Sequence, residues 1–433
     1  MTSLVPVRFV RTVVASLAGV FLLMAPMAFG QAPDQAQTRT TVPVPRASPE
    51  NRYGLLDEPS FITKGIDLFN RRANRSREPK DGFYVELGNM ITGAGWVSAG
   101  PGYRKHVFGD NAIVSASGAV SVRLYRNAQA SIEFPHVGSD HVKFGAQTLF
   151  RDALQVNYFG LGNDSSENAR SGYRLQTNDL ATYASVGVRS LFLQARAGWL
   201  QPVTVSSMGR DATYPDTVAL FTERGAPGLS QQPAFLHGDV SLGVDTRDSV
   251  GHATRGGLYQ ATWSTFIDQD SGLNTFQRYE AEVSQYVPLG TDNWILALRG
   301  TTALSAIRSG HEVPFYLMPN LGGRNDRGFI DYRFHDRNMQ AYSIESRWRV
   351  FTHLDAAVFV DAGSVAPTMR GLKFSDLKPA YGVGVRLHNN RVTMARLDFG
   401  HSVEGWHIYF RMNEPFRRTT QTNGYRPAAP YVP

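Results

Sequence analysis

The chain has 433 residues, a net charge of +7 and no cysteine. The lack of cysteine excludes disulfide bonds and cysteine-ligated metals as sources of stability. Charged residues make up 19% of the chain and arginine is spread along its whole length, which argues against a dedicated nucleic-acid-binding surface.

Residues 1–30 have the pattern of a secretory signal peptide. Arg8 and Arg11 give a basic start, residues 13–24 are apolar, and Ala28-Phe-Gly30 precedes a cleavage site. A retained membrane helix is the less favoured alternative, because polar and proline-rich sequence follows at once. No later apolar run approaches the roughly 18–20 residues that a membrane helix needs. We therefore expect an exported chain without a membrane-spanning helix.

A linker and one helix are predicted next. Residues 31–57 are rich in proline, threonine and glutamine and poor in apolar residues, which indicates a disordered linker. Residues 58–75 are predicted to form an amphipathic helix, with four apolar side chains near one face: Phe61, Ile62, Ile66 and Phe69. This helix is expected to pack on the rim of the following domain, with a membrane-surface or lumen-plugging position as the alternative.

From residue 83 to residue 416, apolar and polar residues alternate. In residues 191–199, for example, leucine, alanine and tryptophan oppose Gln194, Arg196 and Gly198. A packed soluble core would not tolerate arginine and aspartate on its inner face without partners. A transmembrane barrel explains both faces, with lipid outside and a wet lumen inside. At about 20 residues per strand and connection, we expect about 16 antiparallel strands, followed by a tail at residues 417–433.

Tryptophans near the ends of the predicted strands fit the aromatic girdles of such a barrel: Trp96, Trp199, Trp294, Trp348 and Trp406. The competing interpretation is a large secreted sandwich or propeller. No repeat of blade length supports it.

Two neighbouring strand segments place carboxylates on one face. With a period of two, Glu345 shares a face with Ser343 and Arg347, and Asp361 shares a face with Phe359. Both carboxylates therefore point to the polar side of the sheet. A glycine-rich loop lies upstream, and its Arg327 is able to bridge both carboxylates with charge-assisted hydrogen bonds.

Five segments resemble motifs of one family. They are, in chain order, Asn157-Tyr-Phe-Gly-Leu-Gly-Asn-Asp-Ser-Ser166, Asp245-Thr-Arg-Asp248 with Arg255-Gly-Gly257, Leu321-Gly-Gly323 through Arg327-Gly-Phe329, Phe359-Val-Asp361-Ala-Gly363, and Glu414-Pro-Phe416. The family is the bacterial surface antigen superfamily, outer-membrane assembly factors that include BamA- and TamA-like barrels. Each motif is weak alone, but five in order across the barrel region are fairly specific.

The resemblance implies a long loop folded into the lumen, with Arg327, Gly328 and Phe329 at its tip. It pairs Arg327 with Glu345 and Asp361, as the alternation also suggests. It further implies a strand motif at Phe359 and Gly363 and a closing-strand signal at Phe416. We interpret the arginine as a lock that fixes the loop and tunes the lumen or its lateral seam. The alternative is a structural salt bridge that only restrains the loop.

The chain departs from the family pattern in three places. Asp326 replaces an apolar residue and adds a carboxylate beside Arg327, a change able to weaken or reroute the lock. Residues 31–82 are too few and too rich in proline for the periplasmic POTRA domains that usually precede these barrels. Residues 417–433 extend beyond the terminal aromatic, so the sorting signal is not at the end of the chain.

Catalysis and metal binding are not expected. The histidines are scattered and no H-E-x-x-H motif occurs. Gly400-His-Ser402 resembles part of an outer-membrane lipase site, but adjacent strand residues point in opposite directions. Asp110, Asp245 and Asp248 are candidates for calcium on loops, although loop carboxylates more often simply face water.

We therefore expect an outer-membrane barrel of a Gram-negative bacterium, surrounded by outer-membrane lipid. By the resemblance, it helps proteins or lipids into or across that membrane, with unfolded outer-membrane proteins or lipids as clients. The alternative is a passive pore or a structural barrel. We expect no cofactor and no nucleic-acid partner, and a homo-oligomer joined through the barrel seam remains open.

Overall fold

The computed structural model describes residues 56–73, 81–89, 97–206, 213–290, 293–389 and 392–412. The predicted signal peptide, most of the predicted linker, the C-terminal tail and Phe416 lie outside these residues. The helices are α2 (Ser60–Ala73) and α3 (Thr217–Leu220). The strands are β1 (Gly82–Asn89), β2 (Val97–Val107), β3 (Ala112–Ser121), β4 (Arg126–Phe134), β5 (Val142–Tyr158), β6 (Ser171–Val188), β7 (Leu191–Ser206), β8 (Phe235–Asp245), β9 (Gly256–Asp268), β10 (Phe276–Pro288), β11 (Trp294–Ile307), β12 (Asn320–Leu321), β13 (Phe334–His335), β14 (Asn338–Phe351), β15 (Leu354–Ala366), β16 (Lys378–His388), β17 (Thr393–Ser402) and β18 (Gly405–Arg411).

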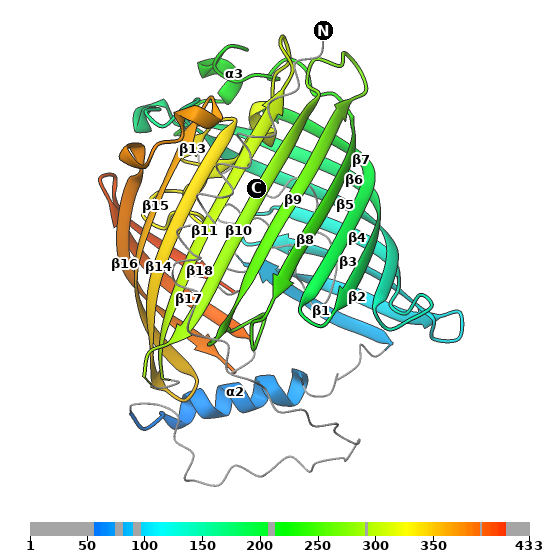
Figure 1. Cartoon of the computed structure of the whole chain (residues 1–433), viewed down its shortest axis with the longest axis vertical. Helices are drawn as coiled ribbons and strands as arrows, with labels where there is room; N and C mark the ends of the chain where they lie inside the picture. The colour runs from blue at the N-terminus through cyan, green and yellow to red at the C-terminus, as the bar shows by residue number, and fades with distance from the viewer. Residues whose placement is uncertain are drawn as a thin grey trace. The chain divides into compact units, whose positions relative to one another are not determined.

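Sixteen of the described strands form one antiparallel sheet, in which strands that follow each other in the chain lie side by side (Figure 1). Strands β12 and β13 form a separate two-stranded sheet within the connection from β11 to β14. In the hydrogen-bonded order of described strands, β1 and β18 stand at the two ends. The predicted antiparallel sheet of about sixteen strands is confirmed.

The two faces of the sheet have opposite chemistry. On β7, Leu191, Leu193 and Trp199 are 56%, 45% and 41% exposed, whereas Gln194 and Arg196 are only 7% and 6% exposed. A soluble protein would bury the leucines and expose the arginine. Here the apolar face points outward, as a bilayer requires, and the polar face points inward. We call the face with the buried polar side chains the inward face.

Connections differ in length at the two ends of the strands. Residues 189–190 join β6 to β7 and residues 352–353 join β14 to β15, whereas residues 308–337 separate β11 from β14 at the opposite end. At the short-turn end, Trp294 and Trp348 pair across β11 and β14, with ring centroids 6.2 Å apart. Trp294 is exposed and Trp348 partly so, and the pair fits the predicted aromatic girdle.

The segment just before α2 contacts the end of β14 and the short turn between β14 and β15. The backbone N–H of His353 donates to Glu58 Oε1 at 2.9 Å, and the N–H of Leu56 donates to the Val350 carbonyl at 2.9 Å. These contacts hold the chain at the short-turn end directly before α2, and the rim position of the helix itself stays a prediction. None of the described helices has the length and apolar character needed to span a bilayer.

Candidate functional site

The connection between β11 and β14, residues 308–337, is a folded element that we call the long loop. Its apolar side chains are buried, among them Val313, Phe315, Leu321 and Phe329 at 0% exposure. A buried connection of this length must satisfy its own backbone groups, and β12 and β13 do so by pairing Leu321 with Phe334. The long loop is therefore a fixed part of the structure rather than a solvated strap.

Two glycines shape the tip of the long loop. Gly322 and Gly323 have φ angles of +116° and +56°, which residues with a side chain rarely adopt. A Cβ atom on Gly322 would lie 2.1 Å from the carbonyl oxygen of Ile330. The N–H of Gly323 donates to the Phe329 carbonyl at 2.8 Å, which closes the tip around Arg327.

Arg327 binds two adjacent strands of the inward face. Its Nε and Nη2 donate to Asp361 Oδ2 and Oδ1 at 2.7 and 2.8 Å, so the guanidinium grips this carboxylate with both arms. Its Nη1 donates to Glu345, and Nη2 also donates to Ser343 at 3.0 Å. Arg327, Glu345 and Asp361 are 3%, 0% and 1% exposed, so these charges interact in a dry site. We call this set of contacts the loop lock.

Other arginines compete for the same carboxylates. Glu345 also accepts from Arg347 Nε at 2.7 Å and from Arg386 Nη2 at 2.9 Å. Arg386 pairs in turn with Asp398 at 2.6 Å. The resulting buried ion cluster contains Arg327, Arg347, Arg386 and Arg396 with Glu345, Asp361 and Asp398. A buried guanidinium group cannot lose its charge by deprotonation. Each carboxylate of the cluster is therefore needed to balance the positive charge of the arginines around it.

The ring of Phe359 packs against the guanidinium group of Arg327. The Arg327 Cζ atom lies 3.5 Å from the centroid of the Phe359 ring, a cation–π contact. The ring has room because its cross-strand partner is Gly382, where a Cβ would lie 2.4 Å from the ring. Phe359, Asp361 and Gly382 thus form the binding site of the Arg327 guanidinium group.

Glycines also let the backbone of the long loop approach the inward face of the sheet. A Cβ on Gly400 would lie 2.0 Å from the Arg327 carbonyl oxygen, and a Cβ on Gly363 would lie 2.3 Å from Leu321 Cδ1. A Cβ on Gly328 would likewise lie too close to Ala380. The tip therefore rests directly on β15, β16 and β17.

Replacing Gly400 with alanine should lift the tip from β17 without changing any charge. Overpacking of this kind costs about 1–3 kcal/mol, so proteolytic cleavage within residues 309–337 should accelerate roughly tenfold. Gly238→Ala is the matched control on β8, because its added Cβ would meet its nearest atom at 3.5 Å. Equal cleavage rates in the two variants would show that the close approach at Gly400 does not hold the loop.

Asp326 lies beside the lock but does not reroute it. Its Oδ1 accepts from the N–H of Gly328 at 3.2 Å, while its buried Oδ2 has no hydrogen-bond partner among the described residues. Burial, followed by the negative charge of Asp361, raises the pKa of Asp326 well above its usual value. Arg327 binds Glu345 and Asp361, so the structure does not have the rerouted lock, while weakening of the lock by Asp326 stays a prediction.

This raised pKa makes attachment of the long loop depend on pH. The stabilisation is fully present below the unfolded-state pKa and is lost as pH rises through the higher folded-state pKa, because the ionised carboxylate must then be buried. Between these two values, opening of the wild-type loop should increase by up to about tenfold per pH unit. Asp326→Asn keeps the acceptor for Gly328 and cannot ionise, so its loop protease resistance should not show this change. Identical pH profiles for both proteins would contradict the assignment.

The long loop also reaches the last two strands of the sheet. Ser402 Oγ donates to the Gly328 carbonyl at 2.6 Å, and the Tyr409 hydroxyl donates to the Phe329 carbonyl. Arg411 pairs with Asp331 at 2.9 Å. The tip of the loop is thus bound to β17 and to the end strand β18.

A second sequence motif, in the segment that follows β5, supports the long loop. Arg333 donates to Ser165 Oγ at 2.9 Å and to Glu404 at 2.7 Å, and its guanidinium lies 4.7 Å from the Phe159 ring centroid. The N–H of Gly162 donates to the His335 carbonyl at 2.8 Å. The segment of residues 157–166 therefore holds the outer part of the long loop.

The structure brings most of the predicted site residues together. Arg327, Glu345, Asp361 and Phe359 share one site, Gly328 and Phe329 contact the closing strands through their carbonyls, and Gly363 packs against Leu321. The sequence reasoning missed the roles of Arg386, Arg396 and Asp398. Their alternation with apolar neighbours in residues 381–388 and 396–399 was the available signal for an inward position.

Comparisons with known proteins agree with the fold described above. The Omp85 superfamily domain matches residues 106–412. Among solved structures, BamA from Haemophilus ducreyi lacking POTRA domains 1–3 is similar over 81% of this chain and 78% of its own, with 14% identity and a TM-score of 0.57. CdiB from Escherichia coli is similar over 78% of this chain and 63% of its own, with 13% identity and a TM-score of 0.50. No curated protein matches the sequence. The likeness, together with the strand order, confirms the predicted all-β barrel class.

Proposed function

Because this chain belongs to the Omp85 superfamily, we propose that it is an outer-membrane barrel of a Gram-negative bacterium that assembles or translocates proteins or lipids. The observation that carries this proposal is the long loop, which is locked by Arg327 and bound to β14, β15, β17 and β18 at once. A passive pore does not need a buried connection that binds its last two strands.

The contacts of the long loop with β18 suggest how clients engage the barrel. Strands β1 and β18 stand at the ends of the described order, and an edge strand offers backbone groups to which another chain can pair. The long loop holds β18 through Tyr409 and Arg411. We infer that the loop sets the position of β18 and so controls access to this seam.

Depletion of the protein tests the proposal. Outer-membrane levels of other barrel proteins and of lipids should fall in depleted cells, and wild-type protein should restore them. Protein carrying Arg327→Ala at equal abundance should restore them poorly. Unchanged levels of both barrels and lipids after depletion would contradict an assembly or translocation function.

A passive pore is the second candidate, and one observation favours it. The inward faces of β2 and β3 carry small hydroxyl side chains at Ser98, Ser115, Ser117 and Ser121, which suit a water-filled lumen. A pore should give steady conductance in planar bilayers and leave the levels of other barrels unchanged. An assembly barrel with a locked loop should conduct little until the lock is broken.

A further inference from the structure

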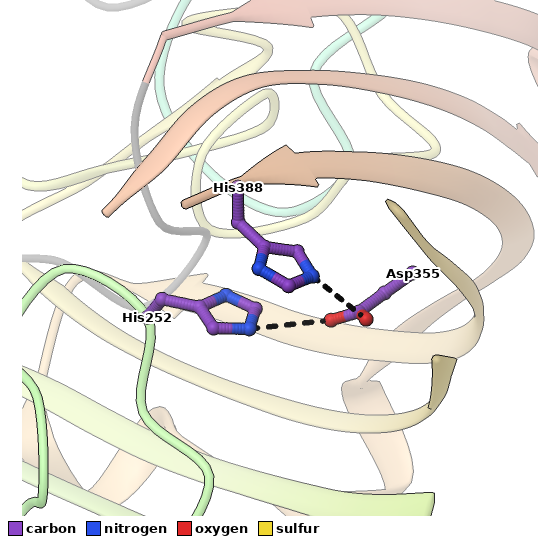
Figure 2. Close-up of side chains that lie close together, drawn as sticks. All are labelled: His252, Asp355 and His388. Atoms are coloured by element: carbon purple, nitrogen blue, oxygen red, sulfur yellow. Dashed lines mark hydrogen bonds and ion pairs between the residues drawn. The ribbon is translucent and has the colours of Figure 1, made fainter. Parts of the chain in front are cut away.

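A second buried cluster lies at the short-turn end of the sheet, away from the loop lock. His252 lies in the turn between β8 and β9, Asp355 near the start of β15, and His388 at the end of β16. All three are buried, at 1%, 1% and 0% exposure. Figure 2 shows the two imidazole rings one above the other, each with a nitrogen turned toward the Asp355 carboxylate. The cluster therefore attaches a turn to two strands that are distant in the sequence.

The turn between β8 and β9, residues 246–255, contacts strands on both sides of this cluster. Ala253 is 0% exposed and packs with Ile295 of β11 in a buried apolar cluster. The Gly251 carbonyl accepts from the N–H of Thr393, at the start of β17, at 2.8 Å. In the described sheet, β14, β15 and β16 lie between β11 and β17. The turn thus spans the short-turn ends of these strands, and we call it the crossing turn.

The two imidazole rings are stacked face to face, with centroids 3.8 Å apart and an interplanar angle of 12°. His388 Nε2 lies 3.0 Å from Asp355 Oδ1, and His252 Nε2 lies 3.4 Å from Oδ2. The same carboxylate therefore faces both rings. One carboxylate balances only one imidazolium ion, so protonation of both rings would leave two stacked positive charges with a single counter-charge.

The groups on β14 and β17 also disfavour a second positive charge. Arg347 and Arg349 of β14 act on His252 with their positive charges. Arg347 is paired with Glu345 at 2.7 Å, so this carboxylate already balances another cation. From β17, the Thr393 hydroxyl lies 3.2 Å from His252 Nδ1 and brings no negative charge. The closed cluster is therefore suited to hold at most one proton on its two rings.

Other titratable groups close to the cluster have partners of their own. His353, whose ring centroid lies 6.5 Å from that of the β16 histidine, pairs with Glu58 at 2.9 Å. Within the crossing turn, Arg247 pairs with Asp245 at 2.7 Å, and Asp248 accepts backbone N–H groups of the same turn. These carboxylates are engaged elsewhere, which leaves the carboxylate of the cluster to balance the stacked rings.

We propose that the stacked pair of His252 and His388 on Asp355 is a pH-sensitive latch, which holds the crossing turn closed and releases it when the periplasm becomes acidic. Barrels of this kind have their short turns on the periplasmic side. Release separates the turn from β11 and β17 and exposes the surfaces that pack there. The device acts at the opposite end of the strands from the long loop.

The sign of the pH effect follows from the proton balance. Burial, followed by the positive charge of His388, lowers the pKa of His252 well below its usual value of about 6.5. The closed turn therefore binds fewer protons than the open turn. Its stability is fully present above the usual pKa and is lost as pH falls from there toward the lowered pKa. This direction is opposite to that expected for Asp326, so the two effects are distinguishable.

The test is thiol labelling, which suits this chain because it contains no cysteine. Ala253→Cys places a thiol where the closed turn is 0% exposed, and Val250→Cys places one on the same turn at a position that is 41% exposed. The full chain in detergent is labelled with a pyridyl disulfide reagent. The ratio of the two labelling rates measures opening of the turn and cancels the intrinsic pH dependence of the chemistry. This ratio should rise by up to about tenfold per pH unit below about pH 6.5.

Three histidine variants, each combined with these two cysteine substitutions, identify the groups responsible. His252→Gln cannot take up the proton, so its ratio should not change with pH. His388→Gln removes the second positive charge and should reduce the response. His237→Gln is the matched control, because His237 is also buried and pairs with Asp179 at 2.8 Å in the wall strands β6 and β8. Its response should equal that of the chain without a histidine substitution.

Several outcomes would overturn the latch. They are a pH-independent ratio in the chain without a histidine substitution, a retained response in His252→Gln, an undiminished response in His388→Gln, and a lost response in His237→Gln. If His252→Gln fails to fold, the first and third of these measurements still decide the matter.

Discussion

Replacing Arg327 with alanine should release the long loop from the inward face of the barrel. The arginine supplies hydrogen bonds to Asp361 and Glu345, and all three residues are at most 3% exposed. Breaking one side of a buried ion pair costs on the order of 3–5 kcal/mol, here because Asp361 stays buried after losing its ion pair with Arg327. We expect proteolysis between Ser309 and Arg337 to accelerate by at least a hundredfold, and single-channel conductance to become larger or noisier.

A charge-retaining substitution refines this result. Arg327→Lys should restore protease resistance only in part, because one ammonium group cannot reproduce the two-armed contact with Asp361 or the stacking on Phe359. Full rescue by lysine would mean that charge alone holds the loop.

Arg196→Ala provides the matched control for loss of a buried arginine. Arg196 pairs with Asp239 at 2.7 Å, and both residues lie in the wall strands β7 and β8. This variant should lower the stability of the barrel while the long loop stays protected. If the long loop of Arg327→Ala resists proteolysis as well as that of the wild type, the loop is held by its other contacts, such as those to β17 and β18.

The faces of the strands could be predicted from the sequence because the period of two is local. Alternation in residues 341–350 and 354–363 was sufficient to place Glu345 and Asp361 inward, and the sheet has that arrangement. The proximity of Arg327 followed from the family resemblance, since a loop has no period from which its target can be derived. Its actual contacts depend on the turn at Gly322 and Gly323.

Long-range partners could not be predicted in the same way. Asp398 joins the ion cluster through Arg386, and this pairing depends on the register of β16 with β17, where Gly384 faces Asp398. The cluster of His252, Asp355 and His388 depends on a turn that crosses to another part of the sheet. Neither relation leaves a periodic signal in one sequence. The neutral glycines at positions 382 and 400 likewise become meaningful only once their opposing atoms are known.

Glu345→Gln should destabilise the barrel wall more than any other single change to the ion cluster. Glu345 accepts hydrogen bonds from Arg327, Arg347 and Arg386 and is 0% exposed. Neutralising it leaves the four arginines of the ion cluster with two carboxylates in that cluster, Asp361 and Asp398. The free energy of unfolding should fall by at least about 3–5 kcal/mol, measured by urea unfolding in detergent. Asp239→Asn, which affects a single arginine, should cause a smaller loss and leave the long loop protected.

A double-mutant cycle separates repulsion among the arginines from loss of a single contact. In Arg327→Met with Glu345→Gln, removal of the loop cation relieves part of the positive charge that the glutamine variant leaves buried. The double variant should therefore be less destabilised than the sum of the two single variants. Additive losses would show that Glu345 acts on Arg347 and Arg386 independently of the loop. Strong coupling would instead mean that the loop and the strands β14 to β17 respond as one electrostatic unit, so that moving the loop changes the inward face of these strands.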